Sequence, residues 1–258
     1  MSFVSRYVGE ILKLQVSLYH ALARLEACTD PDALHALRIS VRRIRSLLAP
    51  VRNIASMAPL RAAAADVGRL TTPVRDLEVM IHELTERGMG VEAERRRRRL
   101  RPSYVDILTS NEMNELFAKL DEWPSALRAS LLANTPGGLE KRIEKALTKQ
   151  VDRLHLALND PDFDRHELRI LVKRTRYLTE AFPTISPLGK KASSSLKAVQ
   201  SALGSWHDHH QWCLKAEVEP DLKPLAPEWE RAALKALDAA ETRLLELSRL
   251  LPKVSAKQ

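Results

Sequence analysis

The sequence predicts an all-α protein built from two similar halves. Glycine is scarce at 8 residues and aromatic residues make up 5% of the chain, while the apolar runs have helical periodicity and few β-branched clusters. An eleven-residue pattern also occurs twice, about 131 residues apart, which indicates an internal duplication. We therefore expect two helical halves related by a pseudo-two-fold axis.

Apolar spacing and helix-breaking residues divide the first half into helices. The expected helices cover residues 2–27, 31–51, 58–87 and 91–132, the last with a break near residue 102. Pro31 and Pro59 suit helix starts, because an amino-terminal turn needs no backbone N–H from that position. Pro73 should kink or restart its helix.

The second half repeats this scheme. Pro136-Gly137-Gly138 is the best linker in the chain, so the prediction is a single domain made of repeats 1–135 and 139–252 joined by residues 136–138. Its expected helices cover residues 139–158, 162–181, 190–203, a further piece beyond Gly204, and 228–250. Three prolines between residues 220 and 227 predict a loop before the last helix.

The duplicated pattern reads H-x-L-R-I-x-V-[RK]-R-x-R and spans residues 35–45 and 166–176. On a helix its His and three of its basic residues fall within an arc of about 80°. We name these sets the first ridge, which is His35, Arg38, Arg42 and Arg45, and the second ridge, which is His166, Arg169, Lys173 and Arg176. Arg43 and Arg174 point to the side. An apolar face of Leu37, Val41, Ile44 and Leu48 lies about 110° away, so each ridge should border the core.

The ridges suit a linear polyanion. Each is about 15 Å long, enough to meet several phosphates in a row. Guanidinium groups stay charged and donate in a fork to two oxygens, and Lys173 can act as a point charge. The chain has 41 Lys and Arg against 33 Asp and Glu, a formal charge of +8 that favours acidic partners. The alternative is that the ridges pair with carboxylates of neighbouring helices.

Further cations are expected at matching levels of the neighbouring helices. Folding each ridge back on the helix before it, as antiparallel neighbours, gives the following secondary set: Lys13, His20 and Arg24, and in the second half Lys145, Lys149 and Arg153. The alternative interpretation is that all six are ordinary solvated charges.

The two ridge histidines lie near helix amino termini, where the helix dipole disfavours a charged imidazole. We hypothesise that His35 and His166 gain protons when a phosphate chain binds, so that binding strengthens as the pH falls through about 6.5. The alternative is a neutral histidine that packs at the hairpin. Asp76 and Asp208 are expected to orient a ridge arginine or cap a helix rather than to act as catalytic acids.

Other features give no catalytic or metal chemistry. Cys28 and Cys213 lack metal spacing and are expected to be small buried hydrophobic residues in a reducing compartment. The run from His207 to His210 has no matching third ligand, so no metal and no cofactor are predicted. Residues 95–99, all arginine, are expected to form a solvated surface.

The paired motifs resemble those of the CHAD family, the conserved histidine α-helical domain. Each ridge is followed some 30 residues later by a basic residue or His and then Asp, namely Arg75-Asp76 and His207-Asp208. The second pair lies in Leu203-Gly204-Ser205-Trp206-His207-Asp208 and has the family's Leu-Gly, whereas the first half has Thr71-Thr72 there. The resemblance implies two four-helix bundles that bind inorganic polyphosphate in a basic channel between them. Its ligand residues would be the two ridges with Arg43 and Arg174, and Arg75 and His207 would lie beside them.

The sequence therefore predicts a polyphosphate-binding module that is not an enzyme. The acidic E-x-E-x-K motif of the triphosphate-processing domain that often accompanies the family does not occur, so a stand-alone module is expected. The alternative is an RNA- or DNA-binding helical protein, which the scarce aromatics and missing reader motifs disfavour. No signal pattern or long apolar run is seen, which predicts a cytoplasmic protein without a membrane partner, with association with polyphosphate granules left open. Protein partners are unknown.

Overall fold

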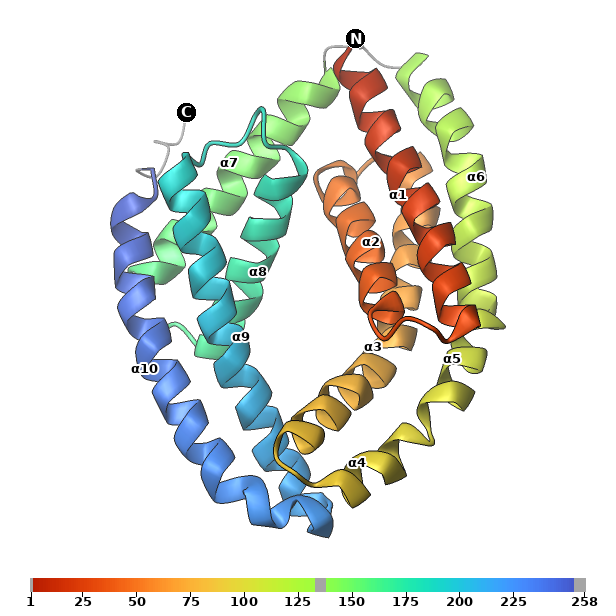
Figure 1. Ribbon diagram of the computed structural model, residues 1–258. Coiled ribbons are helices and arrows are strands. Elements are labelled where there is room, and N and C mark those ends of the chain that lie inside the picture. The colour runs from red at the N-terminus through yellow and green to blue at the C-terminus, as the bar shows by residue number, and fades with distance from the viewer. Residues whose placement is uncertain (1, 133–137, 253–258) are drawn as a thin grey trace. The chain divides into compact units, whose positions relative to one another are not determined.

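The structure is a computed structural model that describes residues 2–132 and 138–252 (Figure 1). These residues form helices and no strand, which confirms the predicted all-α class. The chain divides into two compact units, Met1–Ile143 and Glu144–Gln258. Pro136 and Gly137 of the predicted linker lie outside the described residues, and Gly138 is the first residue of a helix.

The first unit is built on an antiparallel pair of helices that carries the first ridge. Its helices are α1 (Phe3–Ala27), α2 (Ala33–Leu48), α3 (Ala58–Glu86), α4 (Gly90–Arg97), α5 (Leu100–Leu108) and α6 (Asn111–Leu132), with short 3₁₀ turns at Ala49–Val51 and Ala55–Met57. The Ser2 hydroxyl caps α1 by accepting from the Ser5 N–H, and Cys28 ends it in the left-handed region with φ 53°. Tyr7 of α1 donates to the Leu47 carbonyl oxygen of α2 at 3.1 Å, which joins the two helices.

The second unit has long helices around one apolar core. They are α7 (Gly138–Leu158), α8 (Arg165–Ala181), α9 (Lys190–Val218) and α10 (Ala226–Leu250), with a 3₁₀ helix at Pro220–Leu225 before the last. The first six residues of α7, 138–143, belong to the first unit. The Asp164 carboxylate caps α8 by accepting from the Glu167 N–H at 2.8 Å. Apolar residues of all four α-helices pack together, so the second ridge stands on a helix fixed by the core.

Some predicted helix boundaries are wrong. Helix α3 does not restart at Pro73, while a kink there stays a prediction, and α9 runs through Gly204, where an end was expected. Packing of a long helix against its neighbours outweighs one missing hydrogen bond or one glycine, because each costs only about 1–3 kcal/mol. Between α4 and α5 the chain breaks at Arg98 and Arg99, not near Pro102, which lies in the first turn of α5. The predicted loop between residues 220 and 227 is a 3₁₀ helix followed directly by α10.

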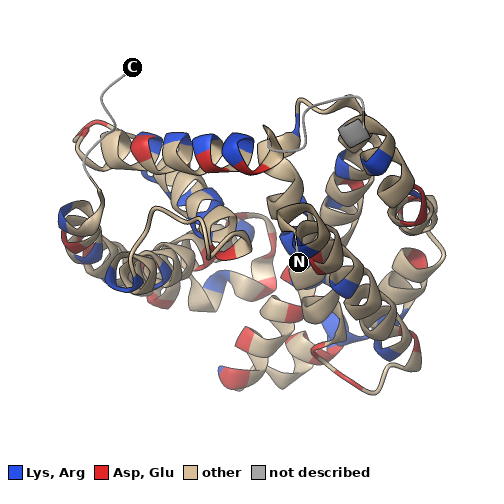
Figure 2. Cartoon of the chain, turned by 90° about the horizontal axis from the view of Figure 1, so that it is seen from above, with Lys and Arg blue, Asp and Glu red and all other residues tan. Residues whose placement is uncertain are grey.

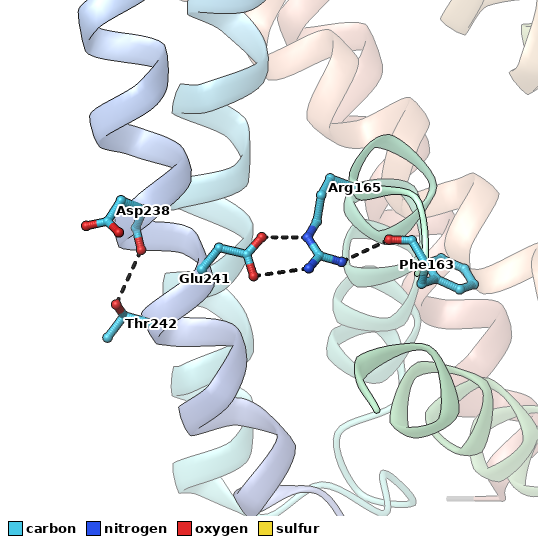
Figure 3. A network of polar contacts seen from close by, with 5 residues as sticks. All are labelled: Phe163, Arg165, Asp238, Glu241 and Thr242. Atoms are coloured by element: carbon cyan, nitrogen blue, oxygen red, sulfur yellow. Dashed lines mark hydrogen bonds and ion pairs between the residues drawn. The ribbon is translucent and has the colours of Figure 1, made fainter. Parts of the chain in front are cut away.

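An ion pair joins the start of α8 to α10 (Figure 3). Arg165 donates from Nε to Glu241 Oε1 at 2.5 Å and from Nη2 to Oε2 at 3.3 Å, the two-pronged geometry that guanidinium and carboxylate prefer. The remaining Nη1 donates to the Phe163 carbonyl oxygen at 2.9 Å. The pair thereby fixes the turn that precedes the second ridge.

Replacing Arg165 with Gln should lower the free energy of unfolding by about 0.5–1 kcal/mol. The two side chains are 32% and 40% exposed, so solvent screens much of their attraction. Chemical denaturation of R165Q, E241Q and the double variant checks this. If the effects of the two single changes simply add in the double variant, the pair contributes nothing to stability.

Candidate functional site

Both ridges border apolar faces that are buried. In α2 the side chains of Leu37, Val41, Ile44 and Leu48 are at most 2% exposed. In α8 the equivalent face contains Leu168 and Val172, which are equally buried. The predicted apolar faces are confirmed, and the ridge cations therefore lie at the edge of each core.

Arg38 of the first ridge is held by α3. Its Nη1 donates to the Thr71 hydroxyl at 2.7 Å, to the Thr72 hydroxyl at 3.1 Å and to the Gly68 carbonyl oxygen at 3.3 Å. Burial lowers the pKa of Arg38, and the Asp76 carboxylate is the strongest opposing charge. The two threonines that stand in place of Leu-Gly thus orient this arginine by hydrogen bonds.

The last arginine of the first ridge also lies against α3. A Cβ added at Gly68 would come within 2.9 Å of Arg45 Nη1, so the missing side chain makes room for the guanidinium. Arg42, which stands between Arg38 and Arg45 in the sequence, is half-buried. Arg43, which was expected to point sideways, is exposed. Gly68 and the two threonines therefore form a surface of α3 against which the guanidinium groups of Arg38 and Arg45 lie.

Arg75 belongs to a polar network that the sequence did not reveal. Its Nη1 donates to Glu78 Oε2 at 2.7 Å, and the Tyr104 hydroxyl of α5 donates to Oε1 of the same carboxylate at 2.7 Å. The Glu78 side chain is only 8% exposed. Burial first, and then the hydrogen bond to Glu78, raise the pKa of Tyr104.

The charges of Arg75 and Glu78 in this network act on His35. Burial lowers the pKa of His35 most, followed by the positive charges of Arg75 and Arg42, while Asp32 and Glu78 act against them. His35, Arg38, Arg42 and Arg75 are thus one charged cluster in the first unit, which we call the first cluster.

The second unit has a corresponding cluster around Arg169. Burial lowers the pKa of Arg169, and the Asp208 carboxylate is the strongest opposing charge, as Asp76 is for Arg38. Both motif carboxylates therefore stabilise the charged form of the first arginine of their ridge. Among the residues that the structure describes, no hydrogen bond or ion pair from the Arg169 guanidinium is found.

His207 is the histidine of the second motif pair, and its ring centroid lies 5.4 Å from that of His166 at an interplanar angle of 43°. Burial lowers the pKa of His207 to about 4, with further lowering by Arg169, His166, His210 and Lys173. Its Nδ1 atom is buried and has no hydrogen-bond partner within the described part of the chain. We call His166, Arg169, Lys173 and His207 the second cluster.

The remaining ridge cations differ in what they contact. Arg176 donates from Nε to Glu180 Oε1 at 2.7 Å and lies 5.3 Å from the centroid of the Tyr177 ring, so it has a partner on its own helix. Arg174 is exposed. Arg176 and, beside the ridge, Arg75 thus pair with a carboxylate of their own helix, whereas the alternative predicted carboxylates of neighbouring helices.

The predicted secondary cations are solvated or paired locally. Lys13 is 2.8 Å from Glu10 one turn away, and Arg24 pairs with Asp30 in the turn after α1. The other four are exposed: His20, Lys145, Lys149 and Arg153. Over residues 2–132 and 138–252, no ion pair joins any of these four to a ridge. Their assignment to a binding surface stays a prediction.

Two further expectations are corrected by the structure. Arg96 is only 5% exposed and donates to the Glu92 carbonyl oxygen, so the arginine run is not solvated on all sides. Cys28 is exposed and Cys213 is half-buried. In the described part of the chain, no group of His, Cys, Asp and Glu could hold a metal ion.

Charge is distributed over all the helices, as Figure 2 shows, with Asp and Glu interspersed among Lys and Arg. A ridge is therefore recognised by its spacing rather than by net charge alone. No helix of the described residues is apolar enough over sufficient length to cross a membrane.

The residues that sequence reasoning missed are partners of the cations. Glu78 follows Arg75 by one helical turn, a spacing that could have indicated the pair. Tyr104 lies on another helix and gave no signal. The role of Thr71 and Thr72 was hidden because they depart from the expected motif.

These features define a helical fold with a duplicated row of cations, in which a carboxylate supports the first arginine of each row. The model of the CHAD domain matches residues 12–215, and the chain belongs to the CHAD family. Its fold is similar to the crystal structure of the CHAD domain from the plant Ricinus communis, with a TM-score of 0.69 and 21% sequence identity over 98% of this chain and 92% of that one. No curated protein matches the chain.

Proposed function

We propose that this protein is a non-catalytic module that binds inorganic polyphosphate through the first and second clusters. The observation that supports this most is the repetition of one arrangement in both units: a histidine and cations in a row, with the first arginine stabilised by a motif carboxylate. A repeating ligand is best matched by a repeating site. Each cluster has cations that stay charged at neutral pH, as a phosphate chain requires.

Membership of the CHAD family supports the same ligand class. We propose in addition that the two repeats form two four-helix bundles related by a pseudo-two-fold axis, with the clusters facing a shared basic channel. The repeat boundaries 1–135 and 139–252, a cytoplasmic location and association with polyphosphate granules belong to the same proposal.

Polyphosphate binding should weaken steeply with salt. Each phosphate contact releases condensed counterions, so the logarithm of the association constant should fall linearly with that of salt concentration. With six to eight cations engaged, raising salt from about 50 to 200 mM should weaken binding by about 10³-fold or more. Calorimetry or fluorescence anisotropy at several salt concentrations measures the slope. A slope near zero would contradict contact with a row of phosphates.

Competition separates polyphosphate from nucleic acid. Polyphosphate should displace labelled RNA at a far lower phosphate concentration than RNA displaces labelled polyphosphate, because the clusters offer cations and no aromatic stacking platform. Equal displacement in both directions would favour a general polyanion binder. Preferential retention of RNA would overturn the proposal.

A further inference from the structure

The two units differ at two equivalent positions beside the motif carboxylates. Arg75 precedes Asp76 directly, and His207 precedes Asp208 directly. Glu78 and His210 are also equivalent, because each lies two residues after its Asp. In the first unit this pair is a guanidinium bound to a nearly buried carboxylate. In the second unit both positions hold histidine, so a fixed ion pair is replaced by two imidazoles, which carry no fixed charge.

The second unit gathers three imidazoles. His166 of α8 lies against His207 of α9, and His210, one turn further along α9, stacks on Trp206 with ring centroids 6.1 Å apart. Trp206 itself packs against the core of the second unit, which fixes the position of its neighbour. We call His166, His207 and His210 the histidine cluster.

The groups that act on this cluster are mainly positive. From α8 come Arg169 and Lys173, and from α9 comes Asp208, whose charge acts on Arg169. Within the described residues no hydrogen bond or ion pair joins His207 to α10. Without a ligand, burial opposes protonation of His207 most, and the positive charges of Arg169 and Lys173 oppose it further. A phosphate chain on Arg169 and Lys173 would cancel the opposition that comes from the cations.

We infer that the histidine cluster takes up protons as phosphate binds, so that the second unit holds a polyphosphate chain more tightly as the pH falls. This inference depends on the proposed function. The first cluster has one imidazole, His35, and otherwise fixed charges, so its contribution should change less with pH. Each proton taken up strengthens binding by up to about tenfold for each unit by which the pH falls.

The test is calorimetry with long-chain polyphosphate near pH 6 in two buffers of different ionisation enthalpy. The difference between the two measured enthalpies gives the number of protons taken up. We expect uptake of about one proton or more by the native protein, and less than half of that by the variant H166N/H207N/H210N. The native protein should bind polyphosphate more tightly at about pH 5.5 than at about pH 7.5. In the same variant this increase in affinity should be smaller by at least about tenfold.

His209 provides the matched control. Its ring nitrogen is 2.7 Å from the Ser205 carbonyl oxygen and its ring lies against Trp212, so it is adjacent in sequence but has other contacts. H209N should keep the native proton uptake. H207R places in the second unit the residue found at position 75, and should keep affinity near pH 7.5 while reducing uptake. This single substitution also serves if the triple variant does not fold.

Three results would overturn the inference. They are binding by the native protein without proton uptake, undiminished uptake in both H166N/H207N/H210N and H207R, and loss of uptake in H209N equal to that in the triple variant. Failure of the native protein to bind polyphosphate at any pH would remove the proposed function as well. Binding with a flat pH profile would leave that function intact and defeat the inference alone.

Discussion

Changing Arg38, Arg42, Arg169 and Lys173 together to alanine should weaken polyphosphate binding by about 10³-fold. Each side chain is half-buried and supplies a charged donor, and such contacts contribute about 1 kcal/mol or more apiece, so that four give about 4 kcal/mol. Calorimetry with long-chain polyphosphate at fixed salt measures the loss. The salt dependence should also become shallower, because fewer counterions are released.

A matched variant separates the site from net charge. Arg99, Arg101, Lys190 and Lys191 are exposed, carry the same total charge and come equally from the two units. Their replacement with alanine should weaken binding by less than about tenfold, as expected for long-range attraction alone. Equal losses in the two variants would show that the clusters are not the site.

The fold of the four-residue variant needs its own check, since Arg38 donates to three groups on α3. Far-ultraviolet circular dichroism and thermal unfolding provide it. R43A/R174A removes two exposed cations without such contacts, and a moderate loss of affinity there with unchanged stability would show that the sides of the ridges also meet the ligand.

Changing Trp123 to alanine should lower the free energy of unfolding of the first unit by about 3–5 kcal/mol. The side chain is 2% exposed in α6, and its ring meets the edge of Tyr7 of α1 with centroids 6.2 Å apart. Its removal loses apolar burial and leaves a cavity between helices that support the first ridge. Urea denaturation followed by circular dichroism measures the effect.

W123F is the informative partner of this variant. The Trp123 Nε1 atom is buried without a hydrogen-bond partner among the described residues, and an unpaired buried donor costs about 1–3 kcal/mol. Phenylalanine removes that donor while keeping much of the apolar ring, so its loss of stability should be well below that of W123A. Equal losses of stability in W123F and W123A would mean that only the full shape of the indole ring fits this site.

Much of this protein could be predicted from residue spacing. Composition and the helical periodicity of the apolar runs predicted the all-α class. The duplicated pattern predicted the two ridge helices and their buried faces, because a period of 3.6 residues assigns each side chain to a face. The long turn after α1 and the turn before α8 were also evident from their proline and aspartate residues. These are local properties, and they depend only on neighbours in sequence.

Other features depend on contacts between helices. Continuity of α3 through Pro73 and of α9 through Gly204 is decided by packing, which outweighs a local preference for a break. Arg96 is buried although it stands in a run of five arginines, because it shares one face of α4 with the buried Ala93, three residues before it. Neither outcome can be inferred from the residues next to it.

The sequence by itself determined where the positive rows lie and that they occur twice. Only the tertiary structure decided which of those charges are supported by partners: α3 hydroxyls for Arg38, Glu78 with Tyr104 for Arg75, and the Asp208 carboxylate for Arg169. The physical reason is that burial and charge pairing depend on residues far apart in the chain, whereas the face on which a side chain stands depends on the helix alone.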